Sequence, residues 1–381
     1  MLPKHLRAPP RRGRAILLRM PAVVSPADSP DPTPLPDTGP DAAHALATER
    51  AWCREALVRV SRTFSLNIRC LEGRMLESVR VAYLLCRAAD ALEDSWPGPE
   101  AEVAERFDAL LAALDGDPAA AWGLAGGAAA QPPRDELDVL ARLPALLHVL
   151  DSLPGPDAAD VRLCVRTLAQ GMKRYAARAA ARGPDVPYLD DDAELHDYCY
   201  VVAGCVGEML TRLVAREIPD GDAARAARRL ELAPVVGEAL QLTNMVLDWS
   251  EDLRGGRCHV PRAWLDRLGL VPADLTRPTP EARELALRLA GLAHAALDRV
   301  PDYLETIPAS AHRFRLFCLL PAQWARASLA LMEGVTDFHA RPVRPRLSRP
   351  AVLWEAARGL LAHADHAATR RLLDGRAPVI E

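Results

Sequence analysis

Residues 241–261, QLTNMVLDWSEDLRGGRCHVP, decide the fold, because a helical pattern here carries acids where a helix normally buries apolar side chains. Four polar side chains have the spacing i, i+4, i+7 and i+8, which places them on one stripe of a helix: Asn244, Asp248, Glu251 and Asp252. Carboxylates this close together repel one another unless a cation lies between them. The stretch therefore predicts a helix that presents carboxylates to a cation.

A second acidic stretch, residues 86–95, repeats this arrangement earlier in the chain. Asp90, Glu93 and Asp94 have the spacing i, i+3 and i+4, and Arg87 lies one turn before them. A single motif of this kind is more often a solvated helix face, but two of them predict the facing walls of one metal site. Oxygen ligands at this density suit Mg²⁺, which takes one or two carboxylates together with water and substrate phosphate. Mn²⁺ is the alternative ion.

Composition places the chain in the all-α class. Hydrophobic residues make up 50% of the 381 residues, and Ala, Leu and Arg dominate over β-branched and aromatic residues. The net charge of −4 gives no basic footprint, which argues against a nucleic-acid partner. The eight cysteines form no CxxC motif, so we expect reduced thiols in a cytoplasmic protein.

The chain divides into two regions of different composition. Residues 1–42 hold ten prolines and no apolar periodicity, which predicts a disordered tail. The basic residues of this tail leave peripheral contact with anionic lipid open. Residues 43–375 carry helical patterns throughout and are expected to form one catalytic domain. No stretch offers the roughly twenty uncharged apolar residues of a membrane span, and we expect a monomer.

Helical periodicity and its breakers predict one bundle of about ten helices. Residues 61–68 and the Gly/Ala-rich stretch before Pro132 are expected to be irregular. The 222–254 segment is expected to be two helices broken near Pro234, and Pro261 to open a short helix. The other predicted helices span 45–60, 76–95, 101–114, 136–153, 158–182, 193–216, 280–304, 309–333 and 350–373.

Two further stretches indicate chemistry. In YCYVVAGCVG (198–207) two glycines lie inside a helical pattern, so something passes close to that backbone, and tight packing of another helix is the favoured reason. Arg254, Gly255, Gly256 and Arg257 form a flexible basic loop that can close on phosphate. Together with the acids, these residues predict a helical enzyme in which Mg²⁺ and arginine hold a diphosphate beside an apolar enclosure.

Four motifs, taken in order, resemble the squalene/phytoene synthase family of head-to-head prenyl transferases. They are SRTFSLNI (61–68), YLLCRAADALED (83–94), YCYVVAGCVG (198–207) and LQLTNMVLDWSEDLRGGR (240–257). The resemblance covers about residues 45–355. It implies an all-α isoprenoid synthase helical bundle around a central cavity.

The resemblance also implies roles for individual residues. Five acids match the Mg²⁺ ligands that bridge to prenyl diphosphates: Asp90, Glu93, Asp94, Asp248 and Asp252. The positions that match substrate-binding residues are Ser61, Arg62, Phe64, Gln241, Asn244 and Arg257. The positions that match catalytic residues are Tyr83, Arg87, Tyr198 and Phe317.

The implied reaction joins two farnesyl diphosphates through a cyclopropyl, presqualene-type diphosphate into a C30 hydrocarbon. Three segments favour squalene, formed with NADPH, over phytoene or dehydrosqualene: DALED (90–94), FCLLPAQWARASLAL (317–331) and PVRPRLSR (342–349). In the last segment Arg344 and Arg346 match residues near the cofactor phosphate. Without the resemblance, these arginines are typical of an ordinary solvated loop.

Three residues depart from the family pattern and leave the product and the prenyl length open. Leu247 stands where an arginine usually precedes the second motif, His259 replaces an aromatic residue, and Arg315 replaces a phenylalanine. Two alternatives to coupling remain. One is a protein of the same fold that ionises, cyclises or binds a single prenyl diphosphate, and the other is a non-catalytic interaction module whose acids are solvated.

Overall fold

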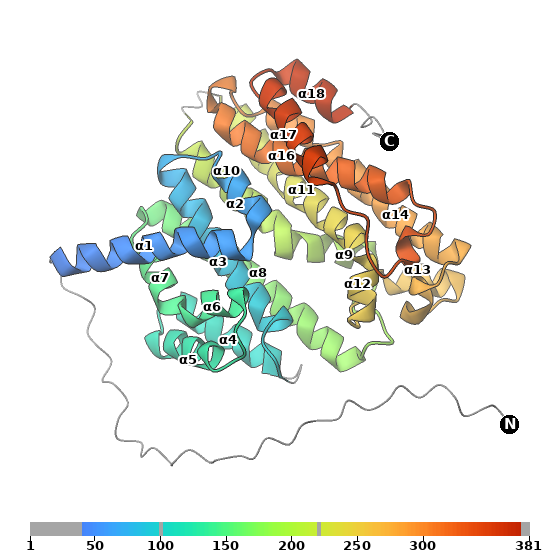
Figure 1. Ribbon diagram of the computed structural model, residues 1–381, viewed down its shortest axis with the longest axis horizontal. Coiled ribbons are helices and arrows are strands. Elements are labelled where there is room, and N and C mark those ends of the chain that lie inside the picture. The colour runs from blue at the N-terminus through green and yellow to red at the C-terminus, as the bar shows by residue number, and fades with distance from the viewer. Residues whose placement is uncertain (1–39, 99–101, 219–221, 375–381) are drawn as a thin grey trace, which may run out of the picture. The chain divides into compact units, whose positions relative to one another are not determined.

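The computed structural model describes residues 40–98, 102–218 and 222–374, and these residues form helices and loops without any strand (Figure 1). The all-α class is therefore confirmed. Contacts divide the chain into Met1–His44 and Ala45–Glu381, and the second unit holds every site discussed below. The predicted tail, residues 1–42, lies almost wholly outside the described residues.

The first half of the chain, as far as residue 182, forms a group of helices around α3. Its helices are α1 (Pro40–Val60), α2 (Arg62–Ile68), α3 (Gly73–Asp94), α4 (Val103–Leu114), α5 (Pro118–Ala129), α6 (Asp135–Ala141), α7 (Leu143–Asp151) and α8 (Gly155–Arg182).

The second half, from residue 192, is built around α11. Its α-helices are α9 (Asp192–Cys199), α10 (Cys205–Ala215), α11 (Ala223–Leu247), α12 (Trp249–Arg254), α13 (Arg262–Leu268), α14 (Pro280–Leu297), α15 (Val300–Glu305), α16 (His312–Glu333), α17 (Arg349–Ala362) and α18 (His366–Asp374). Shorter turns are the π-helical η2 (Tyr200–Gly204) and the 3₁₀ turns η3 (Pro272–Thr276), η4 (Ala309–Ala311) and η5 (Phe338–Ala340).

Helix α3 carries the first acidic motif because its body is buried whereas its last turn is only partly buried. Leu84, Leu85 and Leu92 are wholly buried against the neighbouring α8, α6 and α7. Burial of each such side chain stabilises the fold by about 1.5–3 kcal/mol. The acids occupy the last turn, just before Trp96 and Pro97 end the helical pattern. Packing therefore fixes the direction in which the acidic turn projects.

The predicted break near Pro234 is wrong, since α11 runs through this proline and ends at Leu247. Proline inside a helix costs about 3 kcal/mol, and close packing against η2 and α10 holds this one in place. A methyl group at Gly207 would lie 2.2 Å from the Ala233 carbonyl oxygen, and one at Gly204 would lie 3.4 Å from Pro234 Cβ. The interpretation of the 198–207 glycines as a tight helix contact is confirmed.

Several predicted elements differ from the observed ones because local caps were not recognised. The Gly/Ala-rich stretch is a helix, α5, since the Asp117 carboxylate accepts hydrogen bonds from the first turn and Pro118 fits its first position. Residues 61–68 are also helical from Arg62, because Ser61 caps α2. Four predicted single helices are interrupted: 136–153 near Arg142, 193–216 at η2, 280–304 after Leu297 and 350–373 after Ala362.

Gly237 permits a helix contact as close as that at Gly207, so we predict that Gly237→Ala lowers the free energy of unfolding by about 2 kcal/mol or more. A methyl group there would lie 2.2 Å from the Ala203 carbonyl oxygen, and backbone cannot move aside cheaply. Gly291→Ala on α14 is the matched control, because its methyl group would meet nothing within 4 Å and alanine favours a helix. Denaturant unfolding measures both, and equal stability of the two variants would contradict the packing argument.

One helical run in the described residues, Asp192–Ala215, has the length and apolar composition of a membrane span. Half of its most apolar window is buried inside the protein. The run also contains the π turn η2 that packs against α11.

Candidate active site

The two acidic motifs meet at one arginine. Arg257, which follows α12, donates a hydrogen bond to Asp94 at the end of α3 and another to Asp252 of α12, the latter at 3.2 Å. These acids are far apart in sequence, yet a single guanidinium reaches both. The predicted facing arrangement of the two acidic stretches is therefore present. The basic loop that contains Arg257 lies between them.

The first motif is crowded with negative charge. Burial raises the pKa of Asp90 to about 6, and Asp94 adds to this shift while Arg87 opposes it. Burial also raises the pKa of Glu93 to about 7, again with help from Asp94. Arg87 donates to Asp90 at 2.9 Å and to Glu136 of α6 at 3.4 Å. A cation at this end of α3 would relieve the repulsion among the carboxylates.

The second motif lies at a bend instead of on one straight helix. Asp248 separates α11 from α12, with φ −94° and ψ 6°, so Glu251 is solvent-exposed while Asp252 turns toward α3. Arg344 donates to Asp248 at 2.5 Å. Burial raises the pKa of Asp248 despite this arginine. The bend brings Asp248 and Asp252 to the site and leaves Glu251 outside it.

Asp252 is held as a carboxylate by two cationic or hydrogen-bonding neighbours. Burial acts to raise its pKa, but His259 and Arg257 together hold the pKa below the ordinary value. His259 Nε2 lies 3.3 Å from Asp252 Oδ2, and His259 Nδ1 is hydrogen-bonded to the Tyr188 hydroxyl. His259, a departure from the family pattern, thus lies directly at the site.

Aromatic rings line the space beside these acids. Tyr198 packs edge-on against Tyr175, with ring centroids 5.1 Å apart, and lies 5.3 Å from the His259 ring and 5.9 Å from Tyr188. Burial raises the pKa of Tyr188 and of Tyr198 well above the ordinary value, and the charge of Glu93 contributes to both shifts. Both phenols therefore stay neutral, and their rings can face a cation.

The predicted aromatic residues of α2 and α16 belong to two separate ring pairs. Phe64 stacks on Tyr83 of α3 with centroids 5.5 Å apart. Burial raises the pKa of Tyr83, whereas Ser61 and Arg87 oppose the shift. The Ser61 hydroxyl accepts from the Phe64 N–H at 3.2 Å and so caps α2. Phe317 is buried, stacks on Phe314 at 6.0 Å, and its carbonyl accepts from Asn67 of α2.

For the remaining substrate-binding candidates, the structure describes the side chains of two and leaves out that of the third. Gln241 is half-buried and Asn244 is exposed, and both precede Asp248 on α11. The side chain of Arg62 lies outside the described residues. The substrate-binding role of these three residues stays a prediction.

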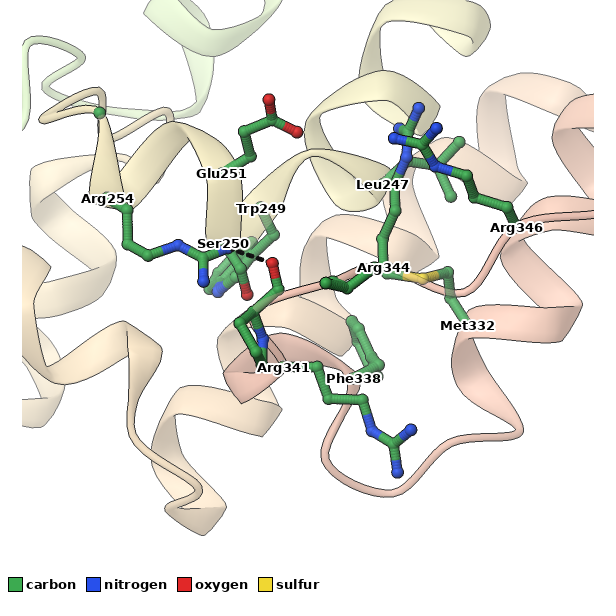
Figure 2. A pocket seen from close by; sticks show the side chains of 13 residues that line it. Leu247, Trp249, Ser250, Glu251, Arg254, Met332, Phe338, Arg341, Arg344 and Arg346 are labelled. Carbon is green, nitrogen blue, oxygen red and sulfur yellow. Dashed lines mark hydrogen bonds between the residues drawn. The ribbon is translucent and has the colours of Figure 1, made fainter.

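A pocket of about 480 Å³ adjoins the second motif (Figure 2). Residues 341–346 form one wall, α12 and the end of α11 form another, and Phe338 and Met332 close it. Arg344 and Arg346 lie next to Leu247, away from Arg254 and Arg341. Four arginines against the single acid Glu251 make this a pocket for an anion.

The contacts of Arg315 explain why an arginine can stand where the family pattern has a phenylalanine. It is 1% exposed and donates to the carbonyl oxygens of Leu304, Ile307 and His363, which ties α16 to α15 and α17. Its guanidinium is therefore part of the framework. Leu247, the third departure, lines the arginine pocket.

The donor set fits Mg²⁺, although no three Asp, Glu, His or Cys side chains of the described residues converge on a common metal position. The acids at the site supply only oxygen, and arginines now neutralise four of them. Mg²⁺ needs only one or two carboxylates when waters and phosphate complete its shell. Asp90, Glu93 and Asp94 would hold ions on one side, and Asp248 and Asp252 on the other.

Sequence reasoning did not find Tyr175, Tyr188 or Glu136. Tyr188 lies in the loop before α9, where no periodicity marks a residue as inward-facing. Tyr175 lies in the long α8, and its hydroxyl donates to Asp197 at 2.5 Å. These residues can be identified only once the fold brings their segments together.

The comparisons with known proteins agree with the geometry. A family model described as squalene/phytoene synthase matches residues 57–351. The chain is 26% identical over 292 residues to human squalene synthase, covering 75% of this chain and 64% of the human one. It is 28% identical over 312 residues to 15-cis-phytoene synthase of Synechocystis sp., covering 80% of each. The structure of TcSQS with the ligand BPH1237 matches with a TM-score of 0.70 at 22% identity, covering 86% of this chain and 89% of that one.

The structural match shows a common fold, so the predicted isoprenoid synthase helical bundle is confirmed. The family model covers more than half of the chain, including both acidic motifs, the 198–207 glycines and Arg257. This chain belongs to the squalene/phytoene synthase family.

Proposed function

We propose that the protein condenses two farnesyl diphosphates head to head, through a cyclopropyl diphosphate, into a C30 hydrocarbon, and that this hydrocarbon is squalene. The observation that carries the proposal is the meeting of the two acidic motifs at Arg257. A coupling enzyme must hold two diphosphates, and each motif supplies acids for one of them. We also propose that the protein is a monomer on the cytoplasmic side, free or in peripheral contact with a membrane.

The residues of the chain would have two roles: the acids and arginines would hold Mg²⁺ and diphosphate, and the aromatic rings would surround the carbocation. Mg²⁺, held by the acids, would stabilise the charge of the departing pyrophosphate. Arg87 and Arg257 pair with these acids and can turn to diphosphate oxygens. The neutral rings of Tyr188 and Tyr198, which pack against each other beside His259, would stabilise the allylic cation.

The carbon chemistry then follows from two ionisations. Loss of pyrophosphate from the first substrate leaves an allylic cation, which the double bond of the second substrate attacks; loss of a proton closes the cyclopropane. Loss of the second pyrophosphate gives a cation that rearranges to join the two C1 carbons. Hydride addition gives squalene, whereas proton loss gives dehydrosqualene or, from C20 substrates, phytoene. Exclusion of water protects both cations.

The arginine pocket supports reduction by NADPH. Arg344 and Arg346 line it and Arg344 also contacts Asp248, so a cofactor phosphate bound there would adjoin the second diphosphate site. NADPH would supply hydride to the final cation. The sequence has no glycine-rich Rossmann motif, so this binding would not use that fold.

We predict that Arg346→Gln raises the KM for NADPH about tenfold, because a lost charged hydrogen bond costs about 1.5–3 kcal/mol. Pyrophosphate release without NADPH should change far less, since Arg344 makes the ion pair with Asp248 and Arg346 acts on that acid only at longer range. Arg267→Gln on α13 is the control and should leave both values unchanged. An unaltered KM in Arg346→Gln would rule this pocket out as the cofactor site.

Stabilisation by a bound ligand distinguishes an enzyme from the alternative, a non-catalytic interaction module whose acids are solvated. We predict that Mg²⁺ with inorganic pyrophosphate, at about 100 times its Kd, stabilises the native state by about 2.7 kcal/mol and raises Tm by about 4 °C. Pyrophosphate without Mg²⁺ should give a much smaller shift. Solvated acids with no ligand role would give none in either case.

A further inference from the structure

Helix α17 exposes its large apolar side chains and buries small or polar ones. Leu353, Trp354, Leu360 and Leu361 are 69%, 54%, 56% and 88% exposed, respectively. The residues buried toward the protein are Glu355, Gly359 and Ala362. A surface helix normally does the reverse. The apolar side of α17 is therefore left uncovered by the described residues.

These side chains form one stripe. Together with the exposed Ala357, they have the spacing i, i+1, i+4, i+7 and i+8, which lies within about a third of the helix circumference. We call this set the α17 apolar face: Leu353, Trp354, Ala357, Leu360 and Leu361. In Figure 1, α17 belongs to the red end of the chain and lies beside α16 and α18.

Contacts with α16 fix the orientation of α17. A methyl group at Gly359 would lie 2.5 Å from Gln323 Oε1 and 2.9 Å from Leu320 Cδ2, so the helices touch closely. Gln323 also donates to Glu355 at 3.3 Å, and Trp324 Nε1 donates to the Val352 carbonyl at 3.3 Å. The helix cannot turn its leucines inward without breaking these contacts.

The surroundings of the face are basic. Residues 341–362 hold five arginines, of which Arg341, Arg344 and Arg346 also line the pocket beside α12, and one acid, Glu355, which is buried and paired with Arg358. By helical position, Arg349 borders one side of the face and Arg358 the other. Arg346 and Arg349 are exposed. An apolar stripe between arginines is typical of a helix that lies in the interface of an anionic membrane.

We propose that the α17 apolar face docks on an anionic lipid bilayer, with Trp354 and the leucines in the interfacial layer and the arginines at the headgroups. The positive charge around the face disfavours two other partners, a second copy of the chain and residues 1–40. A second copy would bring the same arginines together, and residues 1–40 carry six Lys or Arg against three Asp, with ten prolines. The evidence for this surface is the exposure and charge of its residues, and it does not depend on the proposed reaction.

Vesicle flotation of the full chain tests the proposal. The protein should float with phosphatidylcholine vesicles that contain phosphatidylglycerol, and roughly tenfold less with phosphatidylcholine alone. Leu361→Glu should lower partitioning at least roughly tenfold, because it places a charge in the interface and removes an apolar contact. Leu163→Glu on α8 is the matched control, since Leu163 is 50% exposed but lies outside the face.

Two readouts show whether the face itself makes the contact. The fluorescence of the wild type should shift to the blue when anionic vesicles are added, and Trp354→Phe should remove this shift. Thermal unfolding should give the same midpoint for Leu361→Glu as for the wild type, because the side chain is exposed. Unchanged flotation of Leu361→Glu, or equal loss in Leu163→Glu, would overturn the proposal. A dimer that Leu361→Glu converts to a monomer would also overturn it, because a second copy would then cover the face.

Discussion

Asp90→Ala and Asp248→Ala are each expected to reduce turnover of farnesyl diphosphate by at least about 10³-fold. Each variant removes a carboxylate from one motif, and a metal at a developing negative charge supplies several kcal/mol of transition-state stabilisation. Their folds should persist, because Asp90 and Asp248 are 30% and 36% exposed and their arginine pairs contribute about 1 kcal/mol or less.

Glu284→Ala on α14 is the control for these variants. Glu284 is exposed on the surface of the same protein, so its loss should leave both turnover and Tm unchanged. Turnover is followed as pyrophosphate release, and folding as thermal unfolding. Parallel loss of activity and of the folded state in Asp90→Ala would favour a structural role for the acid. Retained turnover in Asp248→Ala would remove the second motif from the mechanism.

Arg257→Gln is expected to lower kcat/KM by about 10²-fold, which is the loss of one charged hydrogen bond to diphosphate. The metal-free protein should also become less stable, because Arg257 is the group that now neutralises both Asp94 and Asp252. Added Mg²⁺ should restore part of that stability, since it places positive charge between the same acids.

Arg262→Gln provides the comparison. Arg262 lies five residues further on and pairs with Asp190, outside the acidic site. Its replacement should leave kcat/KM and the response to Mg²⁺ unchanged. If Mg²⁺ stabilises Arg257→Gln no more than the wild type, then the two acidic motifs do not share a cation.

The sequence was sufficient for the parts of the site that lie on one helix. The spacing of Asp90, Glu93 and Asp94 identifies an acidic turn, and the buried body of α3 follows from its apolar neighbours. The glycines at 204 and 207 correctly indicated a close helix contact. In each case the relevant distance is set by helix geometry or by the absence of a side chain.

Features that depend on tertiary contacts could not be predicted from sequence spacing. Pro234 looks like a helix break, and only the packing of η2 and α10 against α11 keeps that helix intact. The bend at Asp248 removes Glu251 from the stripe that an unbroken helix would present. In the sequence His259 only replaces an aromatic residue of the family pattern, whereas in the structure it joins Asp252 to Tyr188. These outcomes rest on partners distant in sequence.

The most direct test is mass spectrometry of the hydrocarbon extracted after incubating the protein with farnesyl diphosphate and Mg²⁺, with and without NADPH. We predict a C30 hydrocarbon that requires Mg²⁺, with squalene formed only when NADPH is present. A C30 product unaffected by NADPH would keep the coupling but replace squalene by dehydrosqualene. Pyrophosphate release without a coupled product, from farnesyl or geranylgeranyl diphosphate, would contradict the joint use of the two acidic motifs.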